Sequence, residues 1–356
     1  MSDEKEKMGE AYEWIKKWTP VLEIIDPDTY GVEEMPILKE PIIPTMDKKV
    51  IIEAAITGWQ PSQWWRERGV PDLPPGSRGG DTCVREQIDA IVECVQAGAS
   101  CIHMHPRHPD DGKPRMHDAD LTAAINDPAF EQVDFITTSH SFNYDFRKSI
   151  AIDYVTGARD YLEKGKGNRH VQASLIATLA CYTEDHPVAT DETNVEGTKF
   201  YEANDIKPLF SVEPYYFSQF KRTVLDTGAA NWKPYFIAIQ LGKHRDDLQF
   251  NDPWSYMNAI SSMGLVRSVI NDEDMVLGVH PGGRNWLPVS VVGLLFGAQY
   301  IRVGIEDIFY LYPHKDDIPN KTSQTVKMIV DLCKVLGRDV ATVDEARQIL
   351  GIKRTS

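Results

Sequence analysis

Eight short runs of β-branched and apolar residues alternate along this chain with longer amphipathic segments, and this alternation limits the folds open to it. The runs lie at residues 49–56, 100–105, 133–139, 171–179, 207–213, 234–240, 275–280 and 299–305. Alternation of this kind is typical of βα units around a parallel sheet. Eight such units predict an α/β fold whose strands close as a (β/α)8 TIM barrel, with functional groups at the carboxyl ends of the strands.

The segment between the first two runs shows the expected helical pattern. Val84, Ile88, Val92 and Val95 fall on one face, and Gly98 is a natural residue to end a helix. A doubly wound open sheet is the competing topology. It is disfavoured because "AITGWQPSQWW", which includes the end of the first run, does not match the glycine-rich phosphate-binding pattern.

Two regions stand apart from the alternation. Residues 1–47 combine an amphipathic segment with a proline- and acid-rich connector, which predicts an N-terminal arm ahead of a catalytic barrel with C-terminal helices at 48–356. Residues 181–203 are longer and more polar than a βα connection needs. We expect them to form a lid or an insertion at the barrel mouth.

Net charge and cysteine content limit the partners and the cellular compartment expected for the protein. The net charge of −15 argues against nucleic acid or an anionic membrane as a partner. The five cysteines show no CxxC spacing, which favours a reducing compartment. The charged N-terminus does not resemble a signal peptide, and no apolar run reaches the length of a membrane span. These features predict a cytoplasmic protein.

The stretch "SCIHMHPRHPDDG", residues 100–112, places two histidines at the end of the second run. His103 and His105 lie two positions apart, so their side chains face the same side of a strand. Two neutral imidazoles in this arrangement make half of a metal site. The alternative is a pair of buried, hydrogen-bonded core histidines. We expect Arg107, in the turn that follows, to point outward.

The stretch "YIRVGIEDIFY", residues 300–310, closes the eighth run with a cation and two carboxylates. Arg302 and Glu306 share one parity, and Asp307 starts the turn. In a closed barrel only the first strand separates the eighth from the second. Glu306 can therefore complete a His, His, Glu site with positions left open for substrate, as in catalytic metal centres. The alternative is a structural salt bridge from Arg302 to one of the two carboxylates.

These motifs resemble the β-keto acid cleavage enzyme family, zinc-dependent (β/α)8 proteins typified by 3-keto-5-aminohexanoate cleavage enzyme. The matching pieces are "EAAITG" (53–58), "AGASCIHMHPRHPDDGKP" (97–114), "GAQYIRVGIEDIFY" (297–310) and "GRDVATVDEARQILGI" (337–352). The resemblance spans about residues 49–352. Its order and spacing are more specific than any single piece.

The resemblance implies that His103, His105 and Glu306 bind Zn2+. It also implies the reaction: a β-keto acid condenses with acetyl-CoA and is cleaved, giving acetoacetate and the CoA ester of the remaining fragment. Asp307 would take the proton and Arg302 would stabilise oxyanion charge. The partners expected are thus a small β-keto acid and acetyl-CoA, and the protein is expected to be a homo-oligomer, a dimer or a tetramer.

Four further residues are predicted to bind substrate. By the resemblance, Thr137 and Ser174 bond the substrate carboxylate; on position alone, both can instead cap the following helix. Arg284 lies in "GVHPGGRNWLP" (278–288), which can form an anion-binding loop for a CoA phosphate or a carboxylate, or a plain turn. Gln60 stands where the aminohexanoate enzyme has a glutamate. A neutral amide cannot pair with an ammonium group, so a cationic substrate is disfavoured.

Two other functions remain open from the sequence. One is a metal-dependent TIM-barrel hydrolase, although in those barrels the HxH pair lies on the first strand and further histidines close the middle strands. The other is a non-catalytic barrel that binds a metal or a carboxylate. It is motivated by Gln60 and by the third run, which ends in Thr-Thr-Ser-His where the family has Ser-Thr-Gly-Gly.

Overall fold

The computed structural model describes residues 43–58, 74–115, 118–139, 175–181, 191–203, 207–241, 255–308 and 310–352. The chain divides into two compact units, Met1–Ile42 and Ile43–Ser356, and all described residues belong to the second. The arm predicted at residues 1–47 therefore lies outside the described residues, apart from its last five. Within these five, the Thr45 hydroxyl donates to the carbonyl of Gly297 (2.7 Å), which ties this segment to the barrel unit.

Eight parallel strands close into a barrel in chain order. They are β1 (Ile51–Thr57), β2 (Cys101–Met104), β3 (Ile136–Ser139), β4 (Leu175–Cys181), β5 (Lys207–Val212), β6 (Tyr235–Leu241), β7 (Met275–Pro281) and β8 (Tyr300–Val303). Each strand overlaps one of the eight predicted runs. The (β/α)8 prediction is thereby confirmed, and the doubly wound open sheet is excluded, because β8 also pairs with β1.

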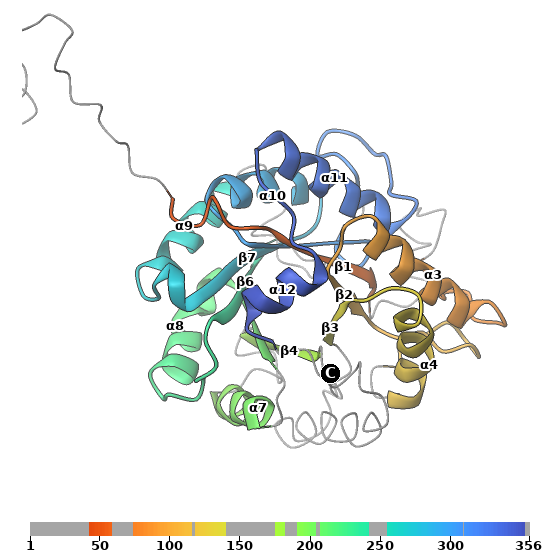
Figure 1. Cartoon of the computed structure of the whole chain (residues 1–356), viewed down its shortest axis with the longest axis horizontal. Helices are drawn as coiled ribbons and strands as arrows, with labels where there is room; N and C mark the ends of the chain where they lie inside the picture. The colour runs from red at the N-terminus through yellow and green to blue at the C-terminus, as the bar shows by residue number, and fades with distance from the viewer. Residues whose placement is uncertain are drawn as a thin grey trace, which may run out of the picture. The chain divides into compact units, whose positions relative to one another are not determined.

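Helices form an outer layer around the strands (Figure 1). The described helices are α3 (Cys83–Gln96), α4 (Ala119–Phe130), α7 (Asp191–Ala203), α8 (Phe217–Phe220), α9 (Ser255–Arg267), α10 (Trp286–Leu295), α11 (Thr322–Val335) and α12 (Val343–Leu350). Short helical turns lie at Pro214–Tyr216, Lys221–Leu225 and Asp272–Asp274. The helix expected after the first run is α3, which buries Ile88 and Ile91 and is followed by Gly98 at φ +115°.

The polar stretch at residues 181–203 differs from its prediction. Its second half is α7, the helix that connects β4 to β5, rather than a lid or insertion. The helix was missed because two residues of its buried face, Asn194 and Thr198, are polar. Thr198 satisfies its hydroxyl by donating to the carbonyl of Asn194, one turn earlier (2.6 Å). Residues 182–190 lie outside the described residues.

The C-terminal helix α12 closes the amino-terminal end of the barrel. A capping box between Thr342 and Glu345 starts it, and Gly351 at φ +66° ends it. Its Leu350 belongs to the same buried cluster as Ile51 and Cys101, at the starts of β1 and β2. Figure 1 shows α12 lying across the ring of strands. The carboxyl ends of the strands are therefore the end where a site can open.

The barrel interior changes character along its axis. Near the amino ends of the strands it is apolar, with Ile51, Cys101 and Ile136 in one buried cluster. One pleat further on, the interior positions are Glu53 on β1 and His103 on β2, both buried. Buried polar groups need partners, so this upper layer requires a connected network rather than simple packing.

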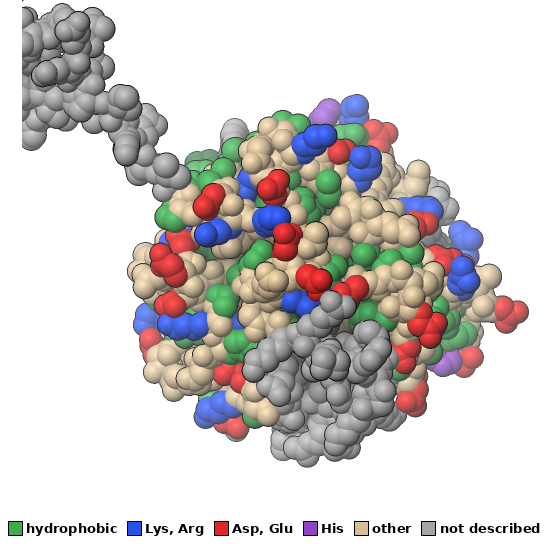
Figure 2. Space-filling model, viewed as in Figure 1, with side chains coloured by type: hydrophobic (Ala, Val, Ile, Leu, Met, Phe, Trp, Pro, Cys, Tyr) green, Lys and Arg blue, Asp and Glu red, His purple; other side chains and the backbone are tan. Residues whose placement is uncertain are grey.

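The outer surface carries both signs of charge. Figure 2 shows acidic and basic side chains interspersed over the described part of this face. Several pair locally, including Lys321 with Glu93 (2.7 Å) and Lys233 with Asp274 (2.7 Å). Among the helices described, none combines the length and the apolar character needed to cross a membrane.

Candidate active site

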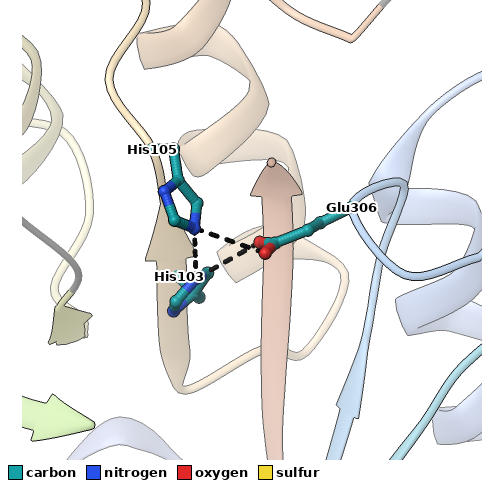
Figure 3. A group of neighbouring side chains, drawn as sticks. All are labelled: His103, His105 and Glu306. Carbon is teal, nitrogen blue, oxygen red and sulfur yellow. Dashed lines mark hydrogen bonds and ion pairs between the residues drawn. The ribbon is translucent and has the colours of Figure 1, made fainter. Parts of the chain in front are cut away.

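Two imidazoles and one carboxylate converge at the carboxyl ends of the strands (Figure 3). His103 lies on β2 and His105 just beyond it, and their Nε2 atoms are 3.1 Å apart. Glu306 approaches from the far side of β1. Its Oε2 lies 3.2 Å from Nε2 of His103, and its Oε1 lies 3.3 Å from Nε2 of His105. All three residues are buried, at 3–6% exposure. The expected convergence of these three side chains is confirmed.

Glu306 reaches this position through a turn, not through strand parity as predicted. Strand β8 ends at Val303, and Gly304 then adopts φ +143°. A Cβ at Gly304 would lie 2.1 Å from the carbonyl oxygen of Ala55, so only glycine lets the chain pass this close to β1. The backbone N–H of Glu306 donates to that same carbonyl (3.3 Å). The turn thus carries the carboxylate over β1 toward β2.

The loop after β2 is held by neighbouring elements. The Thr57 hydroxyl donates to the carbonyl of His105 (2.8 Å). On α3, the Gln87 amide accepts from the backbone N–H of Arg107 (2.8 Å) and donates to its carbonyl (3.0 Å). The prediction that Arg107 points outward is wrong. Its side chain is fully buried and donates to the carbonyls of Gly58 (2.7 Å) and Gly112 (2.9 Å), which fixes the base of the loop.

Arg302 connects three carboxylates beside the histidines. Its Nε donates to Oδ2 of Asp307 (2.6 Å), its Nη2 lies 2.9 Å from Oε2 of Glu306, and its Nη1 lies 3.3 Å from Oε1 of Glu53. All four side chains are at most 4% exposed. The salt bridge considered as the alternative therefore exists, but it includes the candidate metal ligand instead of replacing it.

The electrostatics of the site set the protonation of its groups. Burial, with the Arg302 guanidinium as the second cause, lowers the pKa of His103 from 6.5 to about 3, so its ring is neutral near pH 7. Burial alone would raise the pKa of Glu306, but Arg302 and the two imidazoles outweigh it and hold this pKa well below its usual value. Burial would likewise lower the pKa of Arg302, yet its carboxylate partners hold it well above the usual value.

The three donors fit a divalent metal ion. Their atoms all lie within 4.8 Å of one another. Nitrogen and oxygen donors about 2.1 Å from one ion, and roughly 90–110° apart around it, lie about 3.0–3.4 Å from one another. The observed separations of 3.1–3.3 Å fall in this range. A cation also suits the charge of the cluster, because the contacts of Arg302 gather three buried carboxylates around one guanidinium.

Comparison with known proteins places this geometry in a family. A model of the beta-keto acid cleavage enzyme family matches residues 49–352, which is nearly the whole barrel unit. The chain belongs to the beta-keto acid cleavage enzyme family. It is therefore an enzyme, and its reaction kind is the cleavage of a C–C bond in a β-keto acid. The match includes both histidines, Glu306, Arg302 and Asp307.

Characterised relatives in this family are distant but cover most of the chain. The 3,5-dioxohexanoate:acetyl-CoA acetone transferase of Paraburkholderia graminis is 24% identical over 294 residues, 74% of this chain and 87% of the relative. The 3-keto-5-aminohexanoate cleavage enzyme of Acetoanaerobium sticklandii is 25% identical over 321 residues, 86% of this chain and 100% of the relative.

A solved structure supports the fold. The ternary complex of ObcA with C4-CoA adduct and oxalate superposes with a TM-score of 0.57 and 16% identity, covering 78% of this chain and 68% of ObcA. At this identity the likeness concerns the barrel fold alone.

The residues predicted to bind substrate do not converge as His103, His105 and Glu306 do. In the parallel register Thr138 pairs with His103, whereas Thr137 pairs with Ile102. Paired residues share a face, so Thr138 lies on the interior side and Thr137 faces the helix layer, where Ile102 is packed. Gln60 and Ser174 fall outside the described residues.

Arg284 is engaged by the segment between β8 and α11. Its Nη1 donates to the carbonyl of Lys315 (2.9 Å), its Nη2 pairs with Asp316 (2.7 Å), and its guanidinium carbon lies 3.7 Å from the ring centroid of Tyr310. These contacts anchor that segment near the barrel mouth. Anion binding by Arg284 stays a prediction, and it would have to compete with the carboxylate of Asp316.

Glu53 is a site residue that sequence reasoning missed. It lies in the middle of β1, is fully buried and contacts Arg302. One signal was available, because Glu53 is the charged residue inside the otherwise apolar run "VIIEAAI". A buried charge needs a partner, and here the partner is Arg302. Because Arg302 lies 249 positions away, the local sequence pattern could not identify it.

Proposed function

We propose that this family member is a zinc-dependent enzyme that condenses a β-keto acid with acetyl-CoA and releases acetoacetate and an acyl-CoA. The observation that carries the proposal is the convergence of His103, His105 and Glu306 within 3.1–3.3 Å, with the ion pair of Arg302 and Asp307 directly beside them. Family membership and the acetyl-CoA named for one relative support the reaction.

His103, His105 and Glu306 would hold the ion. Both imidazoles present Nε2 toward the carboxylate, and two nitrogens with one oxygen are a donor set that suits zinc. When bound, a divalent ion acts as a Lewis acid toward the carboxylate and ketone oxygens of a β-keto acid and leaves the adjacent carbon more acidic. Three protein ligands leave positions for these oxygens, as expected of a catalytic site.

Asp307 would accept the proton from the carbon between the ketone and the carboxylate. Its carboxylate is buried and receives a 2.6 Å bond from Nε of Arg302, which fixes its orientation. Arg302 remains charged and can stabilise the negative charge that develops as this carbon attacks the thioester of acetyl-CoA. This attack would break the C–S bond and release CoA thiolate as the new C–C bond joins the acetyl group to the substrate. The thiolate would then add to the original ketone carbon, and the older C–C bond would break to give the new acyl-CoA and the enolate of acetoacetate. Asp307 would return its proton to that enolate carbon.

Other parts of the proposal follow from the sequence. Thr138, which pairs with His103 in the register, would contact substrate in the role first predicted for Thr137, and Ser174 and Arg284 remain candidates for binding anionic groups. Gln60 favours a substrate without a cationic side chain. We further propose that the enzyme works in the cytoplasm as a homo-oligomer.

The proposal is tested by metal analysis together with acetyl-CoA turnover on a panel of β-keto acids. We expect zinc in the purified protein and consumption of acetyl-CoA with at least one keto acid, with acetoacetate as a product. The Asp307→Asn variant should keep its metal and lose about 10²- to 10⁴-fold in kcat. Metal-dependent hydrolysis without thioester consumption would instead favour the hydrolase alternative, and metal binding without turnover would favour the binding barrel.

A further inference from the structure

A buried carboxylate on the neighbouring strand contacts Arg302. Glu53 on β1 is opposite Arg302 in the parallel register of β1 and β8, and their side chains meet at 3.3 Å. Burial, and then the neighbouring carboxylate of Glu53, raise the pKa of the Tyr300 phenol, two residues before Arg302, well above its usual value. Glu53 therefore lies between the guanidinium and a phenol, and all three groups are at most 1% exposed.

The hydrogen bonds continue from Tyr300 across the interior. Nε2 of His280 on β7 lies 2.8 Å from the Tyr300 hydroxyl, and its Nδ1 lies 3.1 Å from the hydroxyl of Ser211 on β5. The side-chain amide of Gln240 on β6 donates to that same hydroxyl. Each member is at most 3% exposed. The chain thus links five of the eight strands, from β5 to β8 and β1.

One assignment of protons is consistent with the contacts from Gln240 to Tyr300. Gln240 donates to Ser211, whose hydroxyl then donates to Nδ1 of His280. His280 is left with its proton on Nε2 and donates to Tyr300, which leaves the phenol proton for the neighbouring carboxylate of Glu53. Every donor points toward Glu53. The fully buried carboxylate of Glu53 thus has the guanidinium of Arg302 and the phenol of Tyr300 as neighbouring donors.

The position of the phenol is fixed by packing. A Cβ at Gly278 would lie 2.5 Å from Cδ1 of Tyr300, so the glycine on β7 makes room for the ring. The ring of Phe236 packs edge-on against it, with the centroids 4.7 Å apart. The phenol beside Glu53 is therefore positioned by three strands of the barrel wall rather than by a loop.

We propose that Glu53 is a positioning residue, which holds the guanidinium of Arg302 against Asp307 and is held in turn by Tyr300 and His280. The other two carboxylates on Arg302 come from the turn after β8, whereas Glu53 comes from a central strand. It is thus the contact that ties the guanidinium to the rigid barrel. The inference rests on the proposed function, in which Arg302 and Asp307 act on the substrate.

The main test is the Glu53→Gln variant, which keeps the side-chain volume and removes the charge. A displacement of catalytic groups by about 1 Å can cost about 100-fold in rate, so we expect kcat to fall about 10- to 100-fold. Both KM values and the metal content should stay near wild type. A purely structural role would instead lower stability and leave kcat per folded, metal-loaded enzyme unchanged.

A second variant, Tyr300→Phe, removes one hydroxyl and keeps the ring. The loss of one hydrogen bond should lower kcat about 3- to 10-fold. Because Tyr300 acts through Glu53, the double variant should be impaired no more than Glu53→Gln alone, within about two-fold. The control is Lys207→Met, which removes a buried charge at the opposite end of the barrel and should keep the wild-type kcat.

A crystal structure of Glu53→Gln gives a readout independent of activity. We expect the guanidinium of Arg302 to leave Asp307. The proposal is overturned if kcat stays within about two-fold of wild type, if metal is lost together with activity, or if Arg302 keeps its wild-type contacts. If no keto acid is turned over by the wild type, the proposed function has failed, and the crystal comparison alone decides the role of Glu53.

Discussion

Gly304→Ala should weaken metal binding without unfolding the barrel. Gly304 has φ +143°, a conformation that side chains other than glycine rarely adopt, which costs about 1–3 kcal/mol. Its Cβ would lie 2.1 Å from the carbonyl oxygen of Ala55. Relief needs a backbone shift of the kind that overpacking causes, at about 1–3 kcal/mol more. Most of the resulting range, about 2–6 kcal/mol, lies below a typical free energy of unfolding of about 5–15 kcal/mol.

The barrel should therefore fold, but the turn that carries Glu306 should move away from β1. This shift should break the hydrogen bond from the Glu306 N–H to the carbonyl of Ala55. The carboxylate of Glu306 should then lose its contacts with His103 and His105. Loss of an interaction that orients a metal ligand typically lowers metal affinity about 10- to 100-fold. Circular dichroism would follow unfolding, and calorimetric titration with Zn2+ would give the affinity.

The control for this prediction is Gly337→Ala. Gly337 also has a positive φ (+69°), but nothing lies within 4 Å of the added Cβ. It should lose about 1–2 kcal/mol from backbone strain and keep its zinc affinity. Wild-type zinc affinity in Gly304→Ala, or equal loss of affinity in both variants, would refute the reasoning.

Three further predictions follow from the charges and contacts of the described residues. Because the pKa of His103 is lowered from 6.5 to about 3, the unfolded chain binds a proton there that the folded protein does not. The metal-free protein should therefore lose about 1.4 kcal/mol of stability per pH unit from this residue as the pH falls below 6.5. Urea titrations at pH 6.5 and pH 5 test this, and an equal loss in His103→Gln would contradict it. Burial lowers the pKa of Lys207 from 10.5 to about 7, so the unfolded chain keeps a proton that the folded protein releases, and stability should rise from pH 7 to pH 10. Lys207→Met should lack this rise, and its persistence would assign it to another group. Gln87→Leu removes both bonds to the backbone of Arg107 and should cost about 1–3 kcal/mol in unfolding experiments, since a buried donor and acceptor lose their partner. Wild-type stability would show that the loop after β2 does not depend on α3.

The alternation of strands and helices was enough to predict the barrel, and closure of the barrel was enough to predict the convergence. His103 and His105 share parity on β2, and β1 alone separates them from the segment of Glu306. The route of Glu306 was predicted wrongly, however. It depends on the backbone conformation of Gly304 and its close approach to Ala55, and parity within one strand does not encode a contact between two strands.

Other features depend on partners distant in sequence. Asn194 and Thr198 lie on the buried side of α7, so the helix lacks the apolar stripe by which a surface helix is recognised. Arg107 was expected outside because charged loop residues are usually solvated, but two backbone carbonyls bind it in the interior. Glu53 is explained by Arg302 and Tyr300 on the last strand, which only the closed barrel brings next to the first.

The central claim is tested most directly by anomalous diffraction at the zinc edge from crystals of the wild-type protein grown with Zn2+. The account predicts one ion per chain, about 2.0–2.2 Å from Nε2 of His103, Nε2 of His105 and a carboxylate oxygen of Glu306. Direct contact among these three side chains with no ion between them, or zinc bound only elsewhere on the molecule, would contradict it.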